Sequence, residues 1–386
     1  MRGRKLEIKE IEIREFNYLL QDISTHNGHH VFSPESKRKP PGFILTIKTE
    51  DGLEGNYRGF VHAPALAAQI RMVAQEFLLG RDPLEREKIW QDIWLSLRHI
   101  GHLGLGPIDI ALWDLAGKYY EESIGSLIGG YKDHLPAYAS TFWGDDSKNG
   151  LSDPEAYAKF AEECLKKGYR AFKIHPFGDP EKDIEVCKEV ADRVGTKMDL
   201  MLDPASEYNT YSEAIKVGKA IDNLNFFWYE DPLRDMGESI HVAKQLTQTL
   251  KTPILGLEHS RTGSCGRANF MSQNALEMVR ADAHLDGGIT GVIKTANTAE
   301  AFGLDVELHL GGPSHLHCMS AIRNTNYFEH GLLHPRVRWI NNQGFTEKIE
   351  QINSDGTLQV PQNPGLGVEI DWEFVNERET SREMIN

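Results

Sequence analysis

From about Leu135 onward the sequence repeats one pattern, in which a short apolar run ends in a polar residue and is followed by an amphipathic segment. Several of these runs are too short for helices and too continuously apolar for half-exposed strands, so buried parallel strands fit best. Strands that alternate with helices eight times predict an α/β fold, a (β/α)8-type barrel. The runs are "LPAYAST", "YRAFKIH", "DLMLDPA", "FFWYEDP", "ILGLEHS", "MVRADAHL", "DVELHL" and "YFEHGLL".

The segments between these runs carry the start and stop signals of helices. In "SDPEAYAKFAEECLKKG", Ser152 or Asp153 can cap the first turn, and Gly168 can end the helix. The segment "DPEKDIEVCKEVADRVG" repeats this arrangement with Asp179 and Gly195. A proline follows each cap at the position where helices accept it best, so both segments are predicted to be helical.

The chain before the barrel has a different pattern and predicts an α+β capping domain over residues 1–130. "LEIKEIEIREF" and "PGFILTIKTEDGLEG" predict antiparallel strands, and "PIDIALWDLAGKYY" predicts a helix. The polar segment "DISTHNGHHVFSPESKRKP" predicts a mobile loop, whose part His26–His30 either closes over the barrel mouth and contacts substrate or stays solvated. The barrel is expected over residues 131–360, and residues 361–386 are expected to pack on the capping domain as a C-terminal tail that completes it.

Charge and composition exclude several classes of partner. The formal net charge of −15 opposes nucleic acid and anionic membrane surfaces. It allows a small anionic substrate, because local cations or a bound metal can reverse the field inside a pocket. No apolar stretch is long enough to span a bilayer, and the alternating N-terminus predicts a strand and not a signal peptide. The four cysteines lack metal-ligand spacing, which predicts a reduced, cytoplasmic enzyme.

An acidic residue ends each of three successive apolar runs: Asp203, Glu230 and Glu258. An isolated carboxylate would be costly to bury after such large apolar residues. In a parallel barrel these strand ends meet at one face, where three carboxylates can converge on one cation. Hard oxygen ligands without a nearby thiolate indicate Mg²⁺, with Mn²⁺ as a substitute. The alternative is that each carboxylate caps a helix or pairs with a lysine.

Lys173 and His175, in "FKIHP", are two residues apart in a predicted strand, so their side chains point to the same side. They can face the three carboxylates from one flank, where a buried lysine finds its counter-charge in them or in an anionic substrate. Taken alone, the pair would be interpreted as a surface lysine and a histidine with ordinary structural hydrogen bonds.

Asp282, in "RADAHL", and His309, in "VELHL", lie on neighbouring later strands. A carboxylate bonded to one imidazole nitrogen orients the ring and makes the other nitrogen a better base. Glu329, in "YFEHG", ends the next strand, where a protonated acid could donate a hydrogen bond to a developing oxyanion. His315 and His317 follow His309 so closely that the stretch could hold either a histidine metal site or one catalytic base.

In their order along the chain these motifs resemble the strand-end motifs of the enolase superfamily, in its mandelate racemase-like subgroup. The segment "GPIDIALWDLAGK" is also similar to that subgroup's helix before the barrel, and the resemblance covers nearly the whole chain. It implies that Asp203, Glu230 and Glu258 bind Mg²⁺. It further implies that His309 and Asp282 form a base dyad that removes the proton α to a carboxylate.

The same resemblance implies that Glu329 supports the resulting enediolate and that Lys173 neutralises the substrate carboxylate. His315 and His317 then fall in the loop after the strand, as loop structure or substrate contacts and not as metal ligands. The subgroup often carries a second lysine where this chain has His175, so His175 could be a substrate contact or a second acid/base.

Within the subgroup, the resemblance predicts a Mg²⁺-dependent lyase that dehydrates a sugar acid, an aldonate or aldarate, to a 2-keto-3-deoxy acid, and it favours a homo-oligomer. One alternative is a racemase or epimerase that uses His175 and His309 on opposite faces of the substrate. A metal-dependent hydrolase of another barrel family would need a His-x-His pair on the first barrel strand, which "LPAYAST" lacks. A binding protein without turnover would not need the intact set of carboxylates and the dyad.

Overall fold

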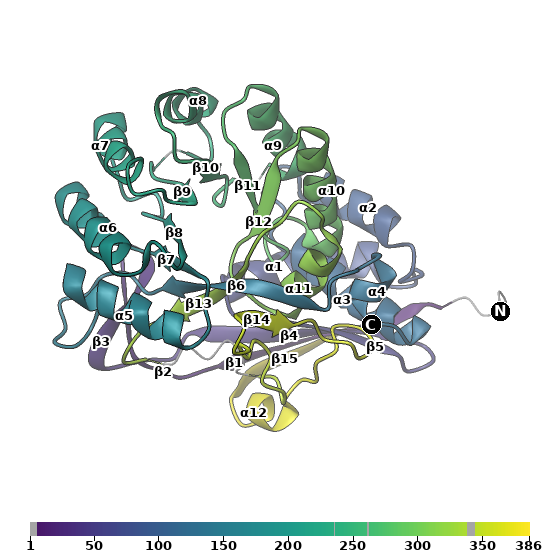
Figure 1. Ribbon diagram of the computed structural model, residues 1–386. Coiled ribbons are helices and arrows are strands. Elements are labelled where there is room, and N and C mark those ends of the chain that lie inside the picture. Colours follow the sequence, from purple (N-terminus) through teal and green to yellow (C-terminus); the bar gives the residue numbers. More distant parts are fainter. Residues whose placement is uncertain (1–5, 235, 261, 338–343) are drawn as a thin grey trace.

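A parallel sheet that curls into a barrel forms the centre of the molecule (Figure 1). The computed structural model describes residues 6–234, 236–260, 262–337 and 344–386. Every predicted barrel run forms a strand, so the predicted fold class is confirmed. In hydrogen-bonded order the strands are β12 (Asp305–Leu308), β11 (Met278–Ala281), β10 (Ile254–Gly256), β9 (Trp228–Glu230), β8 (Asp199–Leu202), β7 (Ala171–Ile174), β6 (His134–Thr141) and β13 (Phe328–Leu333).

Helices cover the outside of this barrel, as Figure 1 shows. The predicted caps are present: the Asp153 side chain accepts a hydrogen bond from the Ala156 amide, and Asp179 accepts from the first turn of its own helix. Among the described residues, no helix is long and apolar enough to cross a membrane. The helices are α5 (Pro154–Lys166), α6 (Pro180–Val194), α7 (Tyr211–Ile221), α8 (Ile240–Thr249), α9 (Gly263–Ser272), α10 (Gly288–Ala301) and α11 (Pro313–Ala321).

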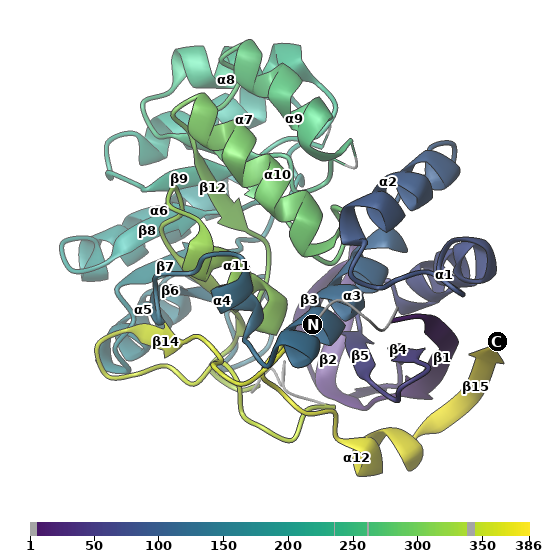
Figure 2. The same ribbon diagram turned by 90° about the vertical axis from the view of Figure 1, so that its right-hand side faces the viewer.

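A second unit, the capping domain, lies beside the barrel (Figure 2). Its antiparallel sheet has the order β15 (Glu379–Ile385), β1 (Ile8–Asn17), β4 (Pro41–Thr49) and β5 (Glu54–Gly59). The last strand of the chain therefore extends a sheet that the first strand begins. Just before the tail, β14 (Thr357–Gln359) pairs with β6, and the tail itself contributes the short helix α12 (Trp372–Asn376). The helices of the capping domain are α1 (Ala63–Phe77), α2 (Arg86–Leu97), α3 (Leu105–Tyr120) and α4 (Ile124–Leu127).

The domain boundaries at residues 1–130, 131–360 and 361–386 stay a prediction. Residues 1–5, with which the first predicted domain and its strand begin, lie outside the described residues.

The prediction of a mobile loop after β1 is wrong, because this segment forms a hairpin of β2 (Leu20–His26) and β3 (His29–Arg38). Its turn is Asn27-Gly28, with φ of 48° and 89°. Two successive residues with positive φ match the twist of the flanking strands, and Asn-Gly is the pair that adopts this turn most readily. The segment is polar because it lies on the surface, although its backbone is paired.

His315 and His317 also differ from the prediction, since they lie in helix α11 and not in a loop. His317 is fully buried; its Nδ1 accepts a hydrogen bond from the Gly125 amide at 3.1 Å, and its Nε2 lies 3.0 Å from the Leu366 carbonyl oxygen. This imidazole therefore links helices α11 and α4 to the C-terminal tail, which is a structural role.

The capping domain is joined to the barrel at the N-terminus of helix α10. The N-cap of α10 is Gly287, which has no side chain to accept the free amides of the first turn. Asp109, from α3, takes this role: its carboxylate accepts from the Thr290 amide at 2.9 Å and from the Thr290 hydroxyl at 2.7 Å. Burial raises the pKa of Asp109 to about 7, while the hydrogen bonds from Thr290 and the positive end of the helix dipole favour its ionised form. Trp90, from α2, adds a hydrogen bond to the Gly287 carbonyl oxygen at 2.7 Å.

This joint predicts different costs for two glycine substitutions. A Cβ on Gly288 (φ +79°) would lie 2.2 Å from Asp109 Oδ2, whereas a Cβ on Gly303 (φ +72°) would meet nothing within 4 Å. Gly303→Ala should cost only the strain of a positive φ, about 1 kcal/mol. Gly288→Ala should also displace Asp109 and cost about 1–2 kcal/mol more, the usual value of a helix cap. Urea denaturation of both variants gives their free energies of unfolding. Equal losses of stability in the two variants would contradict the role of Asp109.

Candidate active site

The predicted site residues come together, most of them at the carboxyl ends of the barrel strands. Glu329 differs from the prediction that it ends its strand, because it is the second residue of β13 and reaches the site from inside the barrel. Parallel strands bring these ends to one face, so residues far apart in the sequence become neighbours. Most of these side chains are buried, whereas those of Glu258 and His309 are 13% and 17% exposed. Lys173 lies in β7, Asp203 follows β8, Glu230 ends β9, Glu258 lies two residues beyond β10, Asp282 follows β11, His309 follows β12, and Glu329 lies in β13.

The three predicted metal ligands form one group. Asp203, Glu230 and Glu258 each offer a carboxylate oxygen, and these oxygens lie within 4.8 Å of one another. Burial, together with the charges of Asp203 and Glu258, raises the pKa of Glu230 well above that of an ordinary glutamate, even against the nearby Arg280. Such a group of hard oxygens with excess negative charge fits a divalent cation such as Mg²⁺.

Lys173 occupies the centre of this acidic group. Its side chain is 1% exposed, and its Nζ lies 2.8 Å from Asp203 Oδ2, 3.1 Å from Glu230 Oε2 and 2.9 Å from Glu329 Oε1. Burial by itself would lower the pKa of Lys173, but the surrounding carboxylates raise it well above its usual range. The lysine is therefore a permanent cation that compensates the buried carboxylates.

His175 lies beside Lys173, as the two-residue spacing predicts. Its Nε2 is 2.9 Å from the same Asp203 Oδ2, and its Nδ1 is 2.7 Å from the Thr141 carbonyl oxygen. Both neighbours are hydrogen-bond acceptors, so both ring nitrogens are engaged. The ring also packs on Trp143, with ring centroids 4.0 Å apart.

The hairpin tip of the capping domain contacts this flank of the barrel mouth. The His29 ring also stacks on Trp143, with ring centroids 4.3 Å apart, and His29 Nε2 lies 2.9 Å from Glu207 Oε1. Asn27 donates to the second oxygen of Glu207. Part of the predicted His26–His30 segment thus lies against the site, and its contact with substrate stays a prediction. Sequence reasoning missed Trp143 and Glu207, because neither stands in a motif.

His309 and Asp282 are paired. His309 Nδ1 lies 2.9 Å from Asp282 Oδ2, and His309 Nε2 lies 3.2 Å from Glu258 Oε1. Burial favours the neutral ring, but Glu258 and then Asp282 raise the pKa of His309 to about 9. Burial likewise opposes ionisation of Asp282, yet the hydrogen bond from His309 lowers the pKa of that carboxyl well below its usual range. An ionised Asp282 fixes the proton on Nδ1, so Nε2 is the nitrogen that can take a proton from a substrate.

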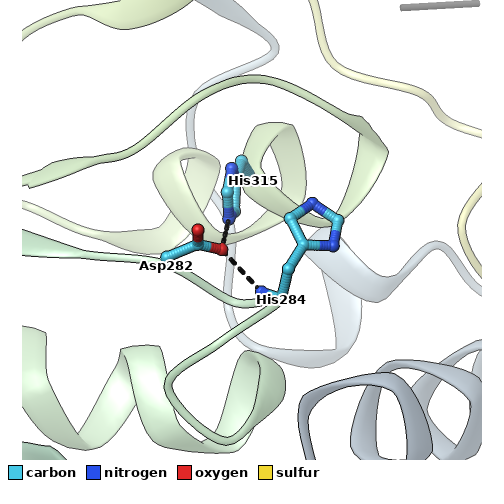
Figure 3. Close-up of side chains that lie close together, drawn as sticks. All are labelled: Asp282, His284 and His315. Atoms are coloured by element: carbon cyan, nitrogen blue, oxygen red, sulfur yellow. Dashed lines mark hydrogen bonds and ion pairs between the residues drawn. The ribbon is translucent and has the colours of Figure 1, made fainter. Parts of the chain in front are cut away.

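A second group, Asp282, His284 and His315, could also hold a metal ion by the proximity of its atoms. Hydrogen bonds account for it instead. His315 Nε2 accepts from the Ala283 amide at 2.9 Å, and its Nδ1 lies 3.1 Å from the Leu310 carbonyl oxygen. Figure 3 shows the His284 ring turned away from Asp282, while the His284 backbone amide donates to that carboxylate.

Glu329 is surrounded by hydrogen-bond donors. Its Oε1 accepts from Ser140 Oγ at 2.8 Å and faces Lys173, and its Oε2 accepts from the Leu310 amide at 2.6 Å and from Arg280 Nη2 at 2.7 Å. Burial opposes ionisation, but Lys173 and Arg280 hold the pKa of Glu329 well below its usual range. This differs from the protonated acid that the sequence led us to expect, because both oxygens act as acceptors.

Arg280 was missed at the sequence level. It lies in β11, fully buried, with Nε 2.8 Å from Glu230 Oε1 and Nη2 2.7 Å from Glu329 Oε2. The signal was present in "MVRADAHL", since a residue two positions before Asp282 projects from the same face of a strand.

Comparison with known proteins identifies the family. A model described as "Enolase C-terminal domain-like" matches residues 156–374, and one described as "Mandelate racemase / muconate lactonizing enzyme, N-terminal domain" matches residues 18–129. The chain belongs to the enolase superfamily. The resemblance to its mandelate racemase-like subgroup is thereby confirmed.

Similar members of the superfamily include named enzymes. The chain is 29% identical over 342 residues to arabinonate dehydratase of Saccharolobus solfataricus, covering 84% of this chain and 87% of that protein. It is 29% identical over 350 residues to D-galactarolactone cycloisomerase of Agrobacterium fabrum, covering 86% and 90%. Among solved structures, D-glucarate dehydratase from Agrobacterium tumefaciens complexed with magnesium matches with 31% identity and a TM-score of 0.91, covering 98% of this chain and 100% of that one.

The site geometry predicts that Glu258 controls the pKa of His309. Replacing it in Glu258→Gln removes the negative charge next to Nε2 and should lower the His309 pKa from about 9 by at least about one unit. Histidine ring signals followed by NMR during a pH titration without divalent cations measure this. Glu277→Gln, just before β11 at the opposite end of the barrel, should leave the His309 pKa unchanged. An unchanged pKa in Glu258→Gln would show that Asp282 alone sets it.

Proposed function

We propose that this protein is a Mg²⁺-dependent sugar-acid dehydratase that converts an aldonate or aldarate to a 2-keto-3-deoxy acid. The observation that carries the proposal is the His309–Asp282 pair beside a group of three carboxylates at the barrel mouth. Relatives named as dehydratases of arabinonate, gluconate and galactarate, and the similar structure of a D-glucarate dehydratase, support the substrate class.

His309 is the proposed base. Its Nε2 would remove the proton from C2 of the substrate, while Asp282 keeps the other nitrogen protonated and the ring oriented. The C2–C3 double bond then forms as the C3–oxygen bond breaks. The proton that His309 has taken is returned to the departing hydroxyl, which leaves as water, and the enol tautomerises to the 2-keto product.

The cation would be held by Asp203, Glu230 and Glu258, with Mn²⁺ as a substitute for Mg²⁺. When bound, it supplies positive charge for the carboxylate on which negative charge develops as C2 loses its proton. The cation would also screen Glu258 from His309. Because the charge of Glu258 raises the His309 pKa, this screening favours the unprotonated ring that a base requires.

Lys173, His175 and Glu329 are the proposed substrate contacts. Lys173 is the cation best placed for the substrate carboxylate, because it lies among the predicted metal ligands. Glu329, held as an anion, can accept a hydrogen bond from a substrate hydroxyl and keeps Lys173 in position. The family resemblance adds a cytoplasmic homo-oligomer to the proposal.

The contacts of the two ring nitrogens of His175 favour dehydration over epimerisation. An epimerase needs a second acid/base on the opposite face of C2, and both nitrogens of His175 already face acceptors, Thr141 and Asp203. A dehydratase needs only His309 for both proton transfers.

The test is proton NMR of the purified protein with Mg²⁺ in D₂O against a panel of aldonates and aldarates. We expect one substrate to lose its C2 proton as 2-keto-3-deoxy signals appear, and chelation by EDTA to stop the reaction. His309→Asn should lower turnover by at least about a thousandfold, within the range that general bases contribute. His241→Asn, an exposed histidine on α8, should keep full turnover.

Two outcomes would count against the proposal. Deuterium that enters C2 without dehydration would indicate the epimerase and make His175 the second base. Full turnover in His309→Asn would remove His309 from the mechanism.

A further inference from the structure

Arg280 contacts the backbone before His309 directly and the backbone after His309 through Glu329. Its Nη1 donates to the carbonyl oxygen of Leu308, the residue before His309, at 3.2 Å. Its Nη2 donates to Glu329 Oε2 at 2.7 Å, and the same oxygen accepts the amide of Leu310, the residue after His309, at 2.6 Å. One guanidinium and one carboxylate thus form a closed set of hydrogen bonds around the peptide units that carry His309.

The backbone at this point needs such support. Leu310 has φ of 59°, in the left-handed region that a leucine rarely adopts. Residues in this region persist where surrounding contacts fix them, and they occur often at functional sites. The amide of Leu310 is held by Glu329, and its carbonyl oxygen by His315. The position of the His309 ring therefore depends on contacts made from inside the barrel.

A guanidinium suits this position better than an ammonium. It is planar and presents several N–H groups in fixed directions, so it can donate to Leu308 and Glu329 at once and still face Glu230. It is also fully buried, and the adjacent carboxylates keep it charged. Among the described residues, its other side-chain hydrogen bond is to the Tyr138 hydroxyl at 2.9 Å, deeper in the barrel.

We propose that Arg280 is a positioning residue, which through Leu308 and the Glu329–Leu310 contact holds His309 in line with the C2 proton of the substrate. This inference rests on the proposed function, because it assigns His309 as the base. Its consequence is that loss of Arg280 slows proton abstraction more than it weakens substrate or metal binding.

The experiment compares Arg280→Met, Arg280→Lys and Tyr138→Phe in the full-length protein with Mg²⁺. Arg280→Met should lower kcat about a hundredfold, the usual effect of displacing a catalytic group by about 1 Å, with KM changed less than about threefold. The deuterium isotope effect at C2 should rise, because proton abstraction becomes rate-limiting. Arg280→Lys keeps the charge but reaches fewer acceptors, so its kcat should lie between Arg280→Met and the parent. Tyr138→Phe keeps all contacts around His309, so its kcat should stay within about threefold of that of the parent.

Amide hydrogen exchange at Leu310 gives a readout that is independent of turnover. The Leu310 amide should lose protection in both Arg280 variants and keep it in Tyr138→Phe. A kcat that falls only with the folded fraction, with an unchanged isotope effect and a protected Leu310 amide, would overturn the proposal. If the parent protein turns over no sugar acid, the proposed function fails, while the exchange at Leu310 still decides whether Arg280 holds this backbone. If Arg280→Met does not fold, Arg280→Lys carries the same test.

Discussion

The structure depends on the balance of buried charges at the carboxyl ends of the barrel strands. Carboxylates come from successive strands, and they repel one another where water cannot screen them. Lys173 and Arg280 offset part of this charge by bridging the same two glutamates through different oxygens: Lys173 contacts Glu230 Oε2 and Glu329 Oε1, and Arg280 faces Glu230 Oε1 and Glu329 Oε2. The resulting ring of alternating basic and acidic side chains holds both glutamates in place, although burial still raises the pKa of Glu230. Asp203 and Glu258 lie at its edge, where a divalent cation would complete the balance.

The same balance explains why the base is held so firmly. Burial opposes a charged ring, but Glu258 and Asp282 raise the pKa of His309 to about 9, which favours a protonated ring between the two carboxylates. If Glu258 holds the proposed cation, its charge would act less on His309, which would favour the unprotonated ring that a base requires. The scaffold around the dyad consists of hydrogen bonds with little freedom, from Ala283 to His315 and from Leu310 to Glu329. Helix α10 follows directly after the segment that carries Asp282 and Ala283, and Asp109 of the capping domain fixes the first turn of this helix.

Much of this arrangement could be predicted from the sequence, because a parallel barrel converts motif order into position. An acidic residue after a short apolar run must lie at the barrel mouth, and this rule alone brings Asp203, Glu230 and Glu258 together. Local backbone chemistry was harder to predict. The pair Asn27-Gly28 signals a hairpin, but the polar residues around it favoured a loop. An exposed hairpin and a loop without backbone pairing have similar polar compositions, so composition does not distinguish them. His315 was expected in a loop because it follows the strand that leads to His309, but the chain turns into helix α11 within four residues of His309. The two-residue spacing places Arg280 on the same strand face as Asp282. The contacts of Arg280 and the low pKa of Glu329 depend instead on contacts between different strands, which no single motif encodes.

The central claim is that one divalent cation binds between the carboxylates of Asp203, Glu230 and Glu258, which lie at the ends of strands β8, β9 and β10. Anomalous diffraction from crystals grown with Mn²⁺ tests it most directly, because the scattering of the ion locates it without reference to activity. The account predicts one strong peak at coordination distance, about 2.0–2.3 Å, from oxygens of Asp203, Glu230 and Glu258. A peak at Asp282, His284 and His315 would contradict it. The absence of any peak between the three carboxylates at saturating Mn²⁺ would contradict it as well.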